Sequence, residues 1–170
     1  MILVLQEIKN NNMKEIYHNL YIGSQEDYEN TIKGQKGWYI IHACKEPYHR
    51  QVLGYKGRAA PKNHPEYFFA HRENRLILNL IDANTPDYIP KVIIDEVINE
   101  IDKHIKDQKV LVHCNQGFSR SATIGLLYLH HIHVISDNFS EAEKEYLKVY
   151  PGYCPKNGMR MFAFNNWDNY

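Results

Sequence analysis

The sequence is poor in cysteine, has no surplus of charge of either sign and contains no long apolar run. Its three cysteines, Cys44, Cys114 and Cys154, lack the paired spacing of a disulfide framework or a zinc ribbon, which favours a reducing compartment. Twenty Lys and Arg residues balance twenty Asp and Glu residues, so no global field favours nucleic acid or an acidic membrane surface. No run of about eighteen apolar residues exists, and residues 1–5 are too short for a signal peptide or a membrane span. We therefore expect a soluble, cytoplasmic and monomeric protein with no stable nucleic-acid or membrane partner.

The length of 170 residues suits one compact domain. Residues 1–12 are expected to form an N-terminal arm with a short strand, and residues 13–170 to form the folded domain. Apolar runs predict strands over residues 19–24, 37–43, 76–81 and 110–113. Apolar residues at helical spacing predict helices over residues 90–107, 120–132 and 140–150. This alternation predicts an α/β domain with a central, mostly parallel sheet flanked by helices.

Several shorter signals mark where elements should begin and end. Ser24 is expected to cap a helix, with Asp27 completing a capping box, and Ser140 to cap another, with Glu143 three residues later. Pro65 favours the start of a short helix over residues 65–71.

The stretch from Val110 to Ser121 carries most of the chemistry. A branched apolar run leads through a tight turn into the head of a helix, so successive backbone N–H groups and the helix N-terminus should form an anion site. This turn holds Cys114 and, six residues later, Arg120. The local field would lower the pKa of the Cys114 thiol from about 8.5 to roughly 3.5–7.5, and the guanidinium could hold two phosphate oxygens. A buried and inert cysteine would leave the arginine and the turn unexplained.

The segment His113-Cys114-Asn-Gln-Gly117-Phe-Ser-Arg120-Ser121 resembles the signature of the cysteine-dependent protein tyrosine phosphatases. Its second half, from Gly117 onward, resembles the dual-specificity branch of that superfamily, and Leu20-Tyr-Ile-Gly-Ser24 adds a second, weaker match. The resemblance implies a dual-specificity phosphatase fold, a catalytic domain over residues 13–170, and no metal or cofactor.

The resemblance also implies a role for each residue of the signature. Cys114 would be the nucleophile and Arg120 the phosphate clamp. Ser121 would donate to the sulfur while the cysteinyl-phosphate breaks down, and His113 would orient the loop from behind. Gly117 would let the backbone approach the phosphate. The substrate would lie against the loop residues Asn115, Gln116, Gly117, Phe118 and Ser119.

A general acid is also needed, to protonate the leaving oxygen and then to activate water. Asp82 is the candidate, because it follows a predicted strand and lies 114 − 82 = 32 residues before the cysteine, a spacing similar to that of the family. Parallel strands open on one sheet edge, so the loops after both strands can meet there. Asp87, five residues further on, is the rival, although it could simply stabilise the following helix electrostatically.

By resemblance, the substrate would be a phosphorylated protein carrying phosphotyrosine, with phosphoserine or phosphothreonine as further candidates. The loop positions between Cys114 and Arg120 carry no lysine, which argues against a highly charged inositol phosphate. Removal of an RNA 5′-phosphate is an open alternative.

The segment 44–64 is expected to be irregular because it contains two prolines and two glycines. It is also basic, with five Lys and Arg residues against Glu46 alone. This surplus either draws in a phosphorylated partner or belongs to a merely solvated loop. Cys44 should end a strand at the same sheet edge as Cys114, so it is a possible redox partner that could capture oxidised Cys114 as a disulfide. The alternative for Cys44 is a small buried side chain.

Three other functions fit parts of the sequence less well. A phosphate-reading pseudoenzyme or interaction module would need only Arg120 and the turn, whereas Cys114 and Asp82 are both present. A metal site built from His42, Cys44, His113 and Cys114 is disfavoured because neighbouring residues on a strand point to opposite faces. A sulfur transferase also places a cysteine in an anion loop, but the match at Leu20 to Ser24 favours the phosphatase.

Overall fold

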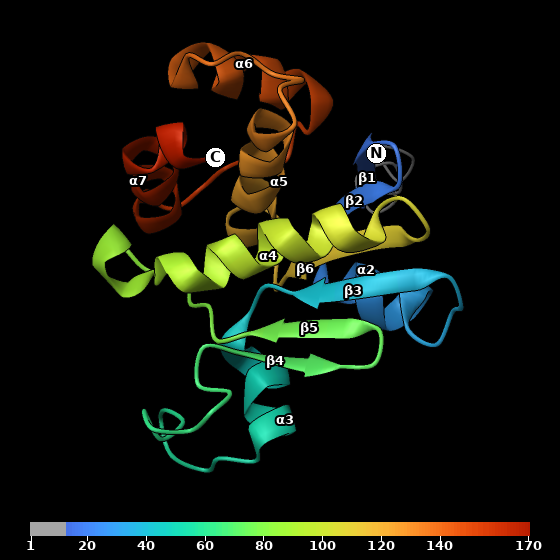
Figure 1. Cartoon of the computed structure of the whole chain (residues 1–170), viewed down its shortest axis with the longest axis vertical. Helices are drawn as coiled ribbons and strands as arrows, with labels where there is room; N and C mark the ends of the chain where they lie inside the picture. The colour runs from blue at the N-terminus through green and yellow to red at the C-terminus, as the bar shows by residue number, and fades with distance from the viewer. Residues whose placement is uncertain (1–12) are drawn as a thin grey trace, which may run out of the picture.

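The computed structural model describes residues 13–170, which form one α/β domain around a six-stranded sheet. The N-terminal arm expected over residues 1–12 lies outside the described residues. The strands are β1 (Lys14–Tyr17), β2 (Leu20–Ser24), β3 (Trp38–His42), β4 (Phe69–Arg72), β5 (Arg75–Leu78) and β6 (Lys109–Cys114). Their order across the sheet is β1-β2-β6-β3-β5-β4 (Figure 1). The four inner strands run parallel and the two edge strands antiparallel, so the predicted fold class is confirmed.

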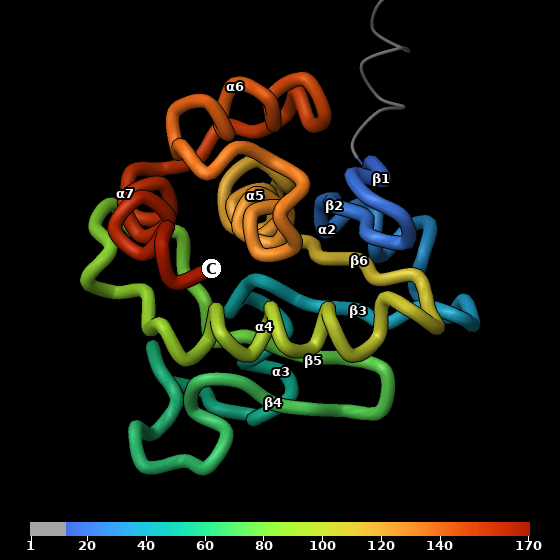
Figure 2. Tube along the Cα trace, turned by 45° about the horizontal axis from the view of Figure 1, so that its top comes forward, coloured from blue at the N-terminus to red at the C-terminus, as the bar shows by residue number. Residues whose placement is uncertain are grey.

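The helices lie on both faces of this sheet. The α-helices are α2 (Gln25–Asp27), α3 (Arg50–Leu53), α4 (Lys91–His104), α5 (Arg120–His131), α6 (Phe139–Val149) and α7 (Asn157–Asn165). Shorter helical turns are η1 (Tyr28–Ile32), η2 (Lys45–His49), η3 (Pro86–Tyr88) and η4 (Trp167–Asn169). Helices α4 and α5 cover one face, with α6 and α7 outside α5, while α3 lies on the opposite side of the sheet (Figure 2).

The central strands are apolar because both of their faces are covered. Every residue of β3 is buried, and in β6 only Lys109 is exposed, as expected for strands inside a parallel sheet. Helix α5 is buried along almost its whole length, which places it at the centre of the fold. The sheet edge where β2, β3 and β6 end therefore sits on a rigid support.

Two sequence predictions about the middle of the chain are wrong. Residues 65–71 were expected to begin a helix, but Phe69–Arg72 forms strand β4, paired antiparallel with β5 across a tight turn. Pairing with the edge of the sheet outweighs the weak helix-start signal of Pro65. The segment 44–64 was expected to be irregular throughout, which holds for residues 54–64, but residues 45–53 form helical turns that are interrupted at Glu46 and end at Gly54 in the left-handed conformation.

Some of the predicted helix boundaries are confirmed and others are wrong. Ser24 and Asp27 form the predicted capping box. Ser140 is not a cap, because the cap lies two residues earlier at Asn138, whose side chain accepts a hydrogen bond from the Glu141 N–H. The predicted helix over 90–107 is α4, which is slightly shorter than expected.

Across residues 13–170, no helix combines the length and the apolar character that crossing a lipid bilayer requires.

Candidate active site

Cys114 lies at the carboxyl end of β6 with only 2 % of its surface exposed. Its Sγ lies 3.2 Å from the Ser121 Oγ and 3.3 Å from the Gly117 N, whose N–H points toward the sulfur. The Ser121 Oγ also lies 3.2 Å from the carbonyl oxygen of Gly23, on the neighbouring strand β2. The Gly23 carbonyl can only accept, so the single proton of the Ser121 hydroxyl points to Gly23 here and would have to rotate to reach the sulfur. The Gly117 N–H is the donor that favours a negative charge on the sulfur at the base of the turn.

Gly117 closes the turn and could not carry a side chain. Its φ is +83°, and a Cβ atom there would lie 2.9 Å from the carbonyl oxygen of Gly23. The Tyr150 hydroxyl donates to the Gly117 carbonyl at 2.7 Å and so holds the turn from outside. The observed reason for glycine at this position is the close approach of the Gly117 backbone to the Gly23 backbone, and its predicted approach to a phosphate stays a prediction.

Arg120 is a buried cation without a counter-ion. Only 9 % of its surface is exposed, and its guanidinium donates to the Leu80 carbonyl at 3.0 Å and to the Asn115 Oδ1 at 2.6 Å. Its Nε has no partner, and among residues 13–170 no carboxylate lies within ion-pair distance of it. A buried charge that is balanced only by neutral acceptors favours the binding of an anion.

A cavity of about 510 Å³ opens above the sulfur. The backbone N–H groups of Gln116, Phe118 and Ser119 make no hydrogen bond to any residue in 13–170, so they are available to a ligand. These N–H groups precede the N-terminus of α5, where the helix dipole adds positive character. The lining residues are Asp82, Cys114, Asn115, Gln116, Phe118, Ser119, Arg120, Cys154 and Lys156. The turn is thus shaped and charged for an anion.

The structure brings Asp82 into this cavity and leaves Asp87 outside it. The Asp82 Oδ1 accepts a hydrogen bond from the Ser119 Oγ at 2.8 Å. Asp87 is exposed and exchanges hydrogen bonds with Thr85 at the start of η3, which is the local capping role considered for it. Strand β5 ends at Leu78, so Asp82 follows it by four residues rather than directly. Of the two candidates, only Asp82 lines the cavity that holds the Cys114 sulfur.

His113 is the last link of a directional chain of hydrogen bonds behind the turn. Arg75 Nη1 donates to His42 Nε2 at 3.2 Å, which leaves the proton of His42 on Nδ1. That atom lies 2.6 Å from His113 Nε2, and His113 Nδ1 lies 3.2 Å from the Cys114 carbonyl. Both imidazoles are therefore neutral, each with a defined tautomer. Because all their ring nitrogens are engaged, the metal site that combines His42 and His113 with cysteines is not supported.

Acidification should destabilise the protein through His113. Burial lowers the pKa of His113 to about 4, whereas the unfolded value is about 6.5. The unfolded state therefore binds more protons between these values. As pH falls from 6.5 to 4, this residue should lower the free energy of unfolding by on the order of 2–3 kcal/mol. Burial also lowers the pKa of His49 and His130, which contribute in the same direction.

The contribution of His113 can be isolated by measuring thermal unfolding at pH 7 and pH 5. His113→Asn should show a smaller difference in Tm than the wild type. His133→Asn is the matched control, because His133 is exposed and has a φ of 60°, which asparagine tolerates. If the Tm of His113→Asn fell between pH 7 and pH 5 by as much as that of the wild type, His113 would not be a source of the acid destabilisation.

Cys44 is fully buried two residues after the end of β3. Burial raises the pKa of its thiol to about 12, so at neutral pH it is protonated and a poor nucleophile toward oxidised Cys114. Its role as a redox partner stays a prediction, and the geometry favours the small buried side chain.

Sequence reasoning missed the contribution of the chain after α6. Besides Tyr150, the Cys154 N–H donates to the Phe118 carbonyl at 2.9 Å, and the Lys156 N–H donates to the Ser119 Oγ, also at 2.9 Å. Further on, the Gly158 N–H donates to the Ala83 carbonyl at 3.1 Å and fastens the loop that carries Asp82. Each of these bonds involves a backbone group of a distant segment, which no local sequence pattern signals.

Similar solved structures exist, although the sequence matches no protein-family model and no curated protein. The human tyrosine phosphatase-like serine/threonine/tyrosine-interacting protein superposes with a TM-score of 0.65 and 20 % identity, over 95 % of this chain and 99 % of that one. Tk-PTP in its active form superposes with a TM-score of 0.64 and 16 % identity, over 95 % of this chain and 99 % of that one. Human DUSP28 superposes with a TM-score of 0.63 and 14 % identity, over 94 % of this chain and 95 % of that one. At these identities it is the fold that is shared, and the chain therefore has the single-domain α/β fold of the dual-specificity phosphatases.

Proposed function

We propose that this protein is a phosphoric monoester hydrolase that acts on phosphorylated proteins through a cysteinyl-phosphate intermediate. Phosphotyrosine is the primary substrate, with phosphoserine and phosphothreonine as further substrates. The observation that carries the proposal is the buried, carboxylate-free guanidinium of Arg120 in the same cavity as the sulfur of Cys114. A fixed cation and free backbone N–H groups stabilise the charge that spreads over the phosphoryl oxygens in the transition state.

The reaction consists of two in-line displacements at phosphorus. In the first, the Cys114 thiolate forms the S–P bond as the P–O bond to the substrate breaks, and Asp82 gives its proton to the leaving oxygen. In the second, the Asp82 carboxylate takes a proton from water as that water attacks phosphorus and the S–P bond breaks. Ser121, 3.2 Å from the sulfur, stabilises the departing thiolate by a hydrogen bond. The products are the alcohol or phenol and inorganic phosphate.

The cavity suits a protein phosphoester better than a polyphosphorylated small molecule. Apart from Arg120, Lys156 is the only basic side chain that lines it within the described part of the chain. Phe118 is 45 % exposed and lines the cavity, so an aromatic side chain is available there for contact with an aromatic substrate. These two features favour phosphotyrosine.

A phosphate-reading interaction module is the second candidate. The anion site would serve it equally well, and one of the similar structures is described as a phosphatase-like interacting protein. The two functions differ in one measurable respect: the reader binds phosphopeptide without releasing inorganic phosphate.

The test is hydrolysis of an aryl phosphate by the purified protein. We expect release of inorganic phosphate in the presence of a chelator, because the described residues supply both nucleophile and acid without a metal. Vanadate, which mimics the five-coordinate transition state, should inhibit it. Tight binding of phosphopeptide with no phosphate released would contradict the hydrolase and favour the reader.

A further inference from the structure

A second, smaller cavity lies beside the catalytic one. It has a volume of about 170 Å³ and is lined mainly by Lys45, Tyr67, Phe68, Ile81, Tyr88 and Pro90. Ile81 lines this cavity, whereas its neighbour Asp82 lines the catalytic cavity. A single stretch of backbone, the one that carries the proposed acid, therefore separates the two. We call the smaller cavity the aromatic groove.

The aromatic groove displays apolar side chains to solvent. Phe68 is 42 % exposed, Ile81 41 % and Tyr88 67 %. Single exposed apolar residues are ordinary, but three large ones that line one concave site next to a reaction centre mark a binding surface.

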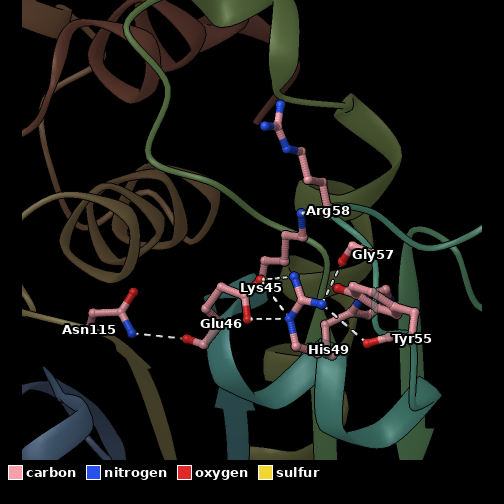
Figure 3. A network of polar contacts seen from close by, with 8 residues as sticks. Lys45, Glu46, His49, Tyr55, Gly57, Arg58 and Asn115 are labelled. Carbon is pink, nitrogen blue, oxygen red and sulfur yellow. Dashed lines mark hydrogen bonds and ion pairs between the residues drawn. The ribbon is translucent and has the colours of Figure 1, made fainter.

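The basic segment borders this groove and is held in a fixed shape. Arg50 donates to both carboxylate oxygens of Glu46 and to the carbonyls of Tyr55 and Gly57, and its guanidinium lies 4.7 Å from the centre of the Tyr55 ring (Figure 3). The Glu46 carbonyl in turn accepts from the Asn115 side chain, so the segment is tied to the catalytic turn (Figure 3). The segment is therefore an ordered wall beside the groove.

Most of the cations of this wall are not neutralised. Glu46 is engaged by Arg50, and Lys45 donates to the Arg58 carbonyl and lines the groove. Lys56, Arg58 and Lys62 are exposed, and no carboxylate in residues 13–170 lies within ion-pair distance of them. The Arg58 side chain extends away from the Arg50 network (Figure 3). The wall therefore complements an acidic partner.

We propose that the aromatic groove and this basic wall bind the substrate chain next to its phosphorylated residue. The groove takes a large apolar side chain, and the wall takes acidic residues. This inference rests on the proposed function and names its substrate class: phosphoprotein segments with an apolar residue and acidic residues close to the phosphorylated position. Because an extended chain spans about 3.3–3.6 Å per residue, a side chain one to three residues from the phosphorylated one can reach a site just across the Asp82 loop.

The experiment compares phosphotyrosyl peptides that differ only beside the phosphotyrosine. One peptide has alanine and serine neighbours, a second set places leucine at each of the three positions on either side, and a third adds glutamates. We expect leucine at one position to raise kcat/KM about tenfold, and glutamates to raise it further at low salt. Tyr88→Ala and Phe68→Ala should each abolish the preference for leucine. The double variant with Lys56→Glu and Lys62→Glu should abolish the preference for glutamate.

The controls separate this inference from the proposed function. Hydrolysis of a small aryl phosphate, which cannot reach the groove, should be unchanged in all these variants. Leu147→Ala and Lys148→Glu, exposed substitutions on α6, should leave both preferences intact. Suppose that aryl phosphate is hydrolysed but leucine is preferred at no position, or that the preference survives Tyr88→Ala. Either result would overturn the assignment of the groove while leaving the proposed hydrolase function intact. Absence of aryl phosphate hydrolysis would overturn the proposed function itself. A dimer in solution that Tyr88→Ala dissociates would show that a second copy of the chain occupies the groove, and would also overturn the assignment.

Discussion

Cys114→Ser is expected to abolish turnover of an aryl phosphate, with kcat lower by on the order of 10⁵-fold or more. A hydroxyl in place of the sulfur would remain protonated at neutral pH and would not attack phosphorus. The anion site itself is unchanged, because Arg120 and the free backbone N–H groups do not depend on the sulfur. The measurement is the initial rate of phosphate release, together with calorimetric binding of vanadate or a phosphopeptide, which the variant should retain.

Cys154→Ser is the matched control for that experiment. It changes the other thiol that lines the cavity, an exposed one whose backbone N–H, rather than its side chain, bonds to the turn, so it tests whether the loss is specific to Cys114. We expect its rate to stay close to that of the wild type. If Cys114→Ser kept a tenth of the wild-type rate, or if Cys154→Ser caused the larger loss, the nucleophile would be assigned wrongly.

Asp82→Ala should lower kcat by roughly 10²- to 10³-fold with little change in KM, since a positioned general acid contributes about that much. The loss should grow as the leaving group becomes more basic, because a basic oxygen needs its proton during bond cleavage, whereas a good phenolate leaving group departs without one. The measurement is kcat for a series of aryl and alkyl phosphates.

Asp87→Ala provides the comparison on the same loop. Asp87 is exposed and bonded to Thr85, so its removal should affect only the start of η3 and leave the leaving-group series as in the wild type. If Asp87→Ala lowered kcat more than Asp82→Ala, Asp87 rather than Asp82 would be the general acid.

The parts of this molecule that could be predicted from sequence are those that local patterns specify. The turn from β6 into α5 is one continuous segment, so strand, turn and helix signals occur side by side with the cysteine and the arginine. Helix α4 was predicted for the same reason, because its apolar residues follow the helical period.

The parts that were missed depend on segments distant along the chain. Strand β4 exists because β5 offers it an edge, and the wrong prediction of a helix there came from reading Pro65 alone. The hydrogen bonds from Tyr150 and Lys156 to the catalytic turn join residues 33 and 37 positions apart, and neither residue type signals such a contact. The partner of Asp82, Ser119, could be identified only when both loops had been placed in space.

The segment from Tyr150 to Gly158 couples the two halves of the proposed chemistry. It bonds both to the turn that bears the sulfur and to the loop that bears the proposed acid. A substitution that loosens this segment should therefore displace the nucleophile and the acid together, although the segment carries neither of them.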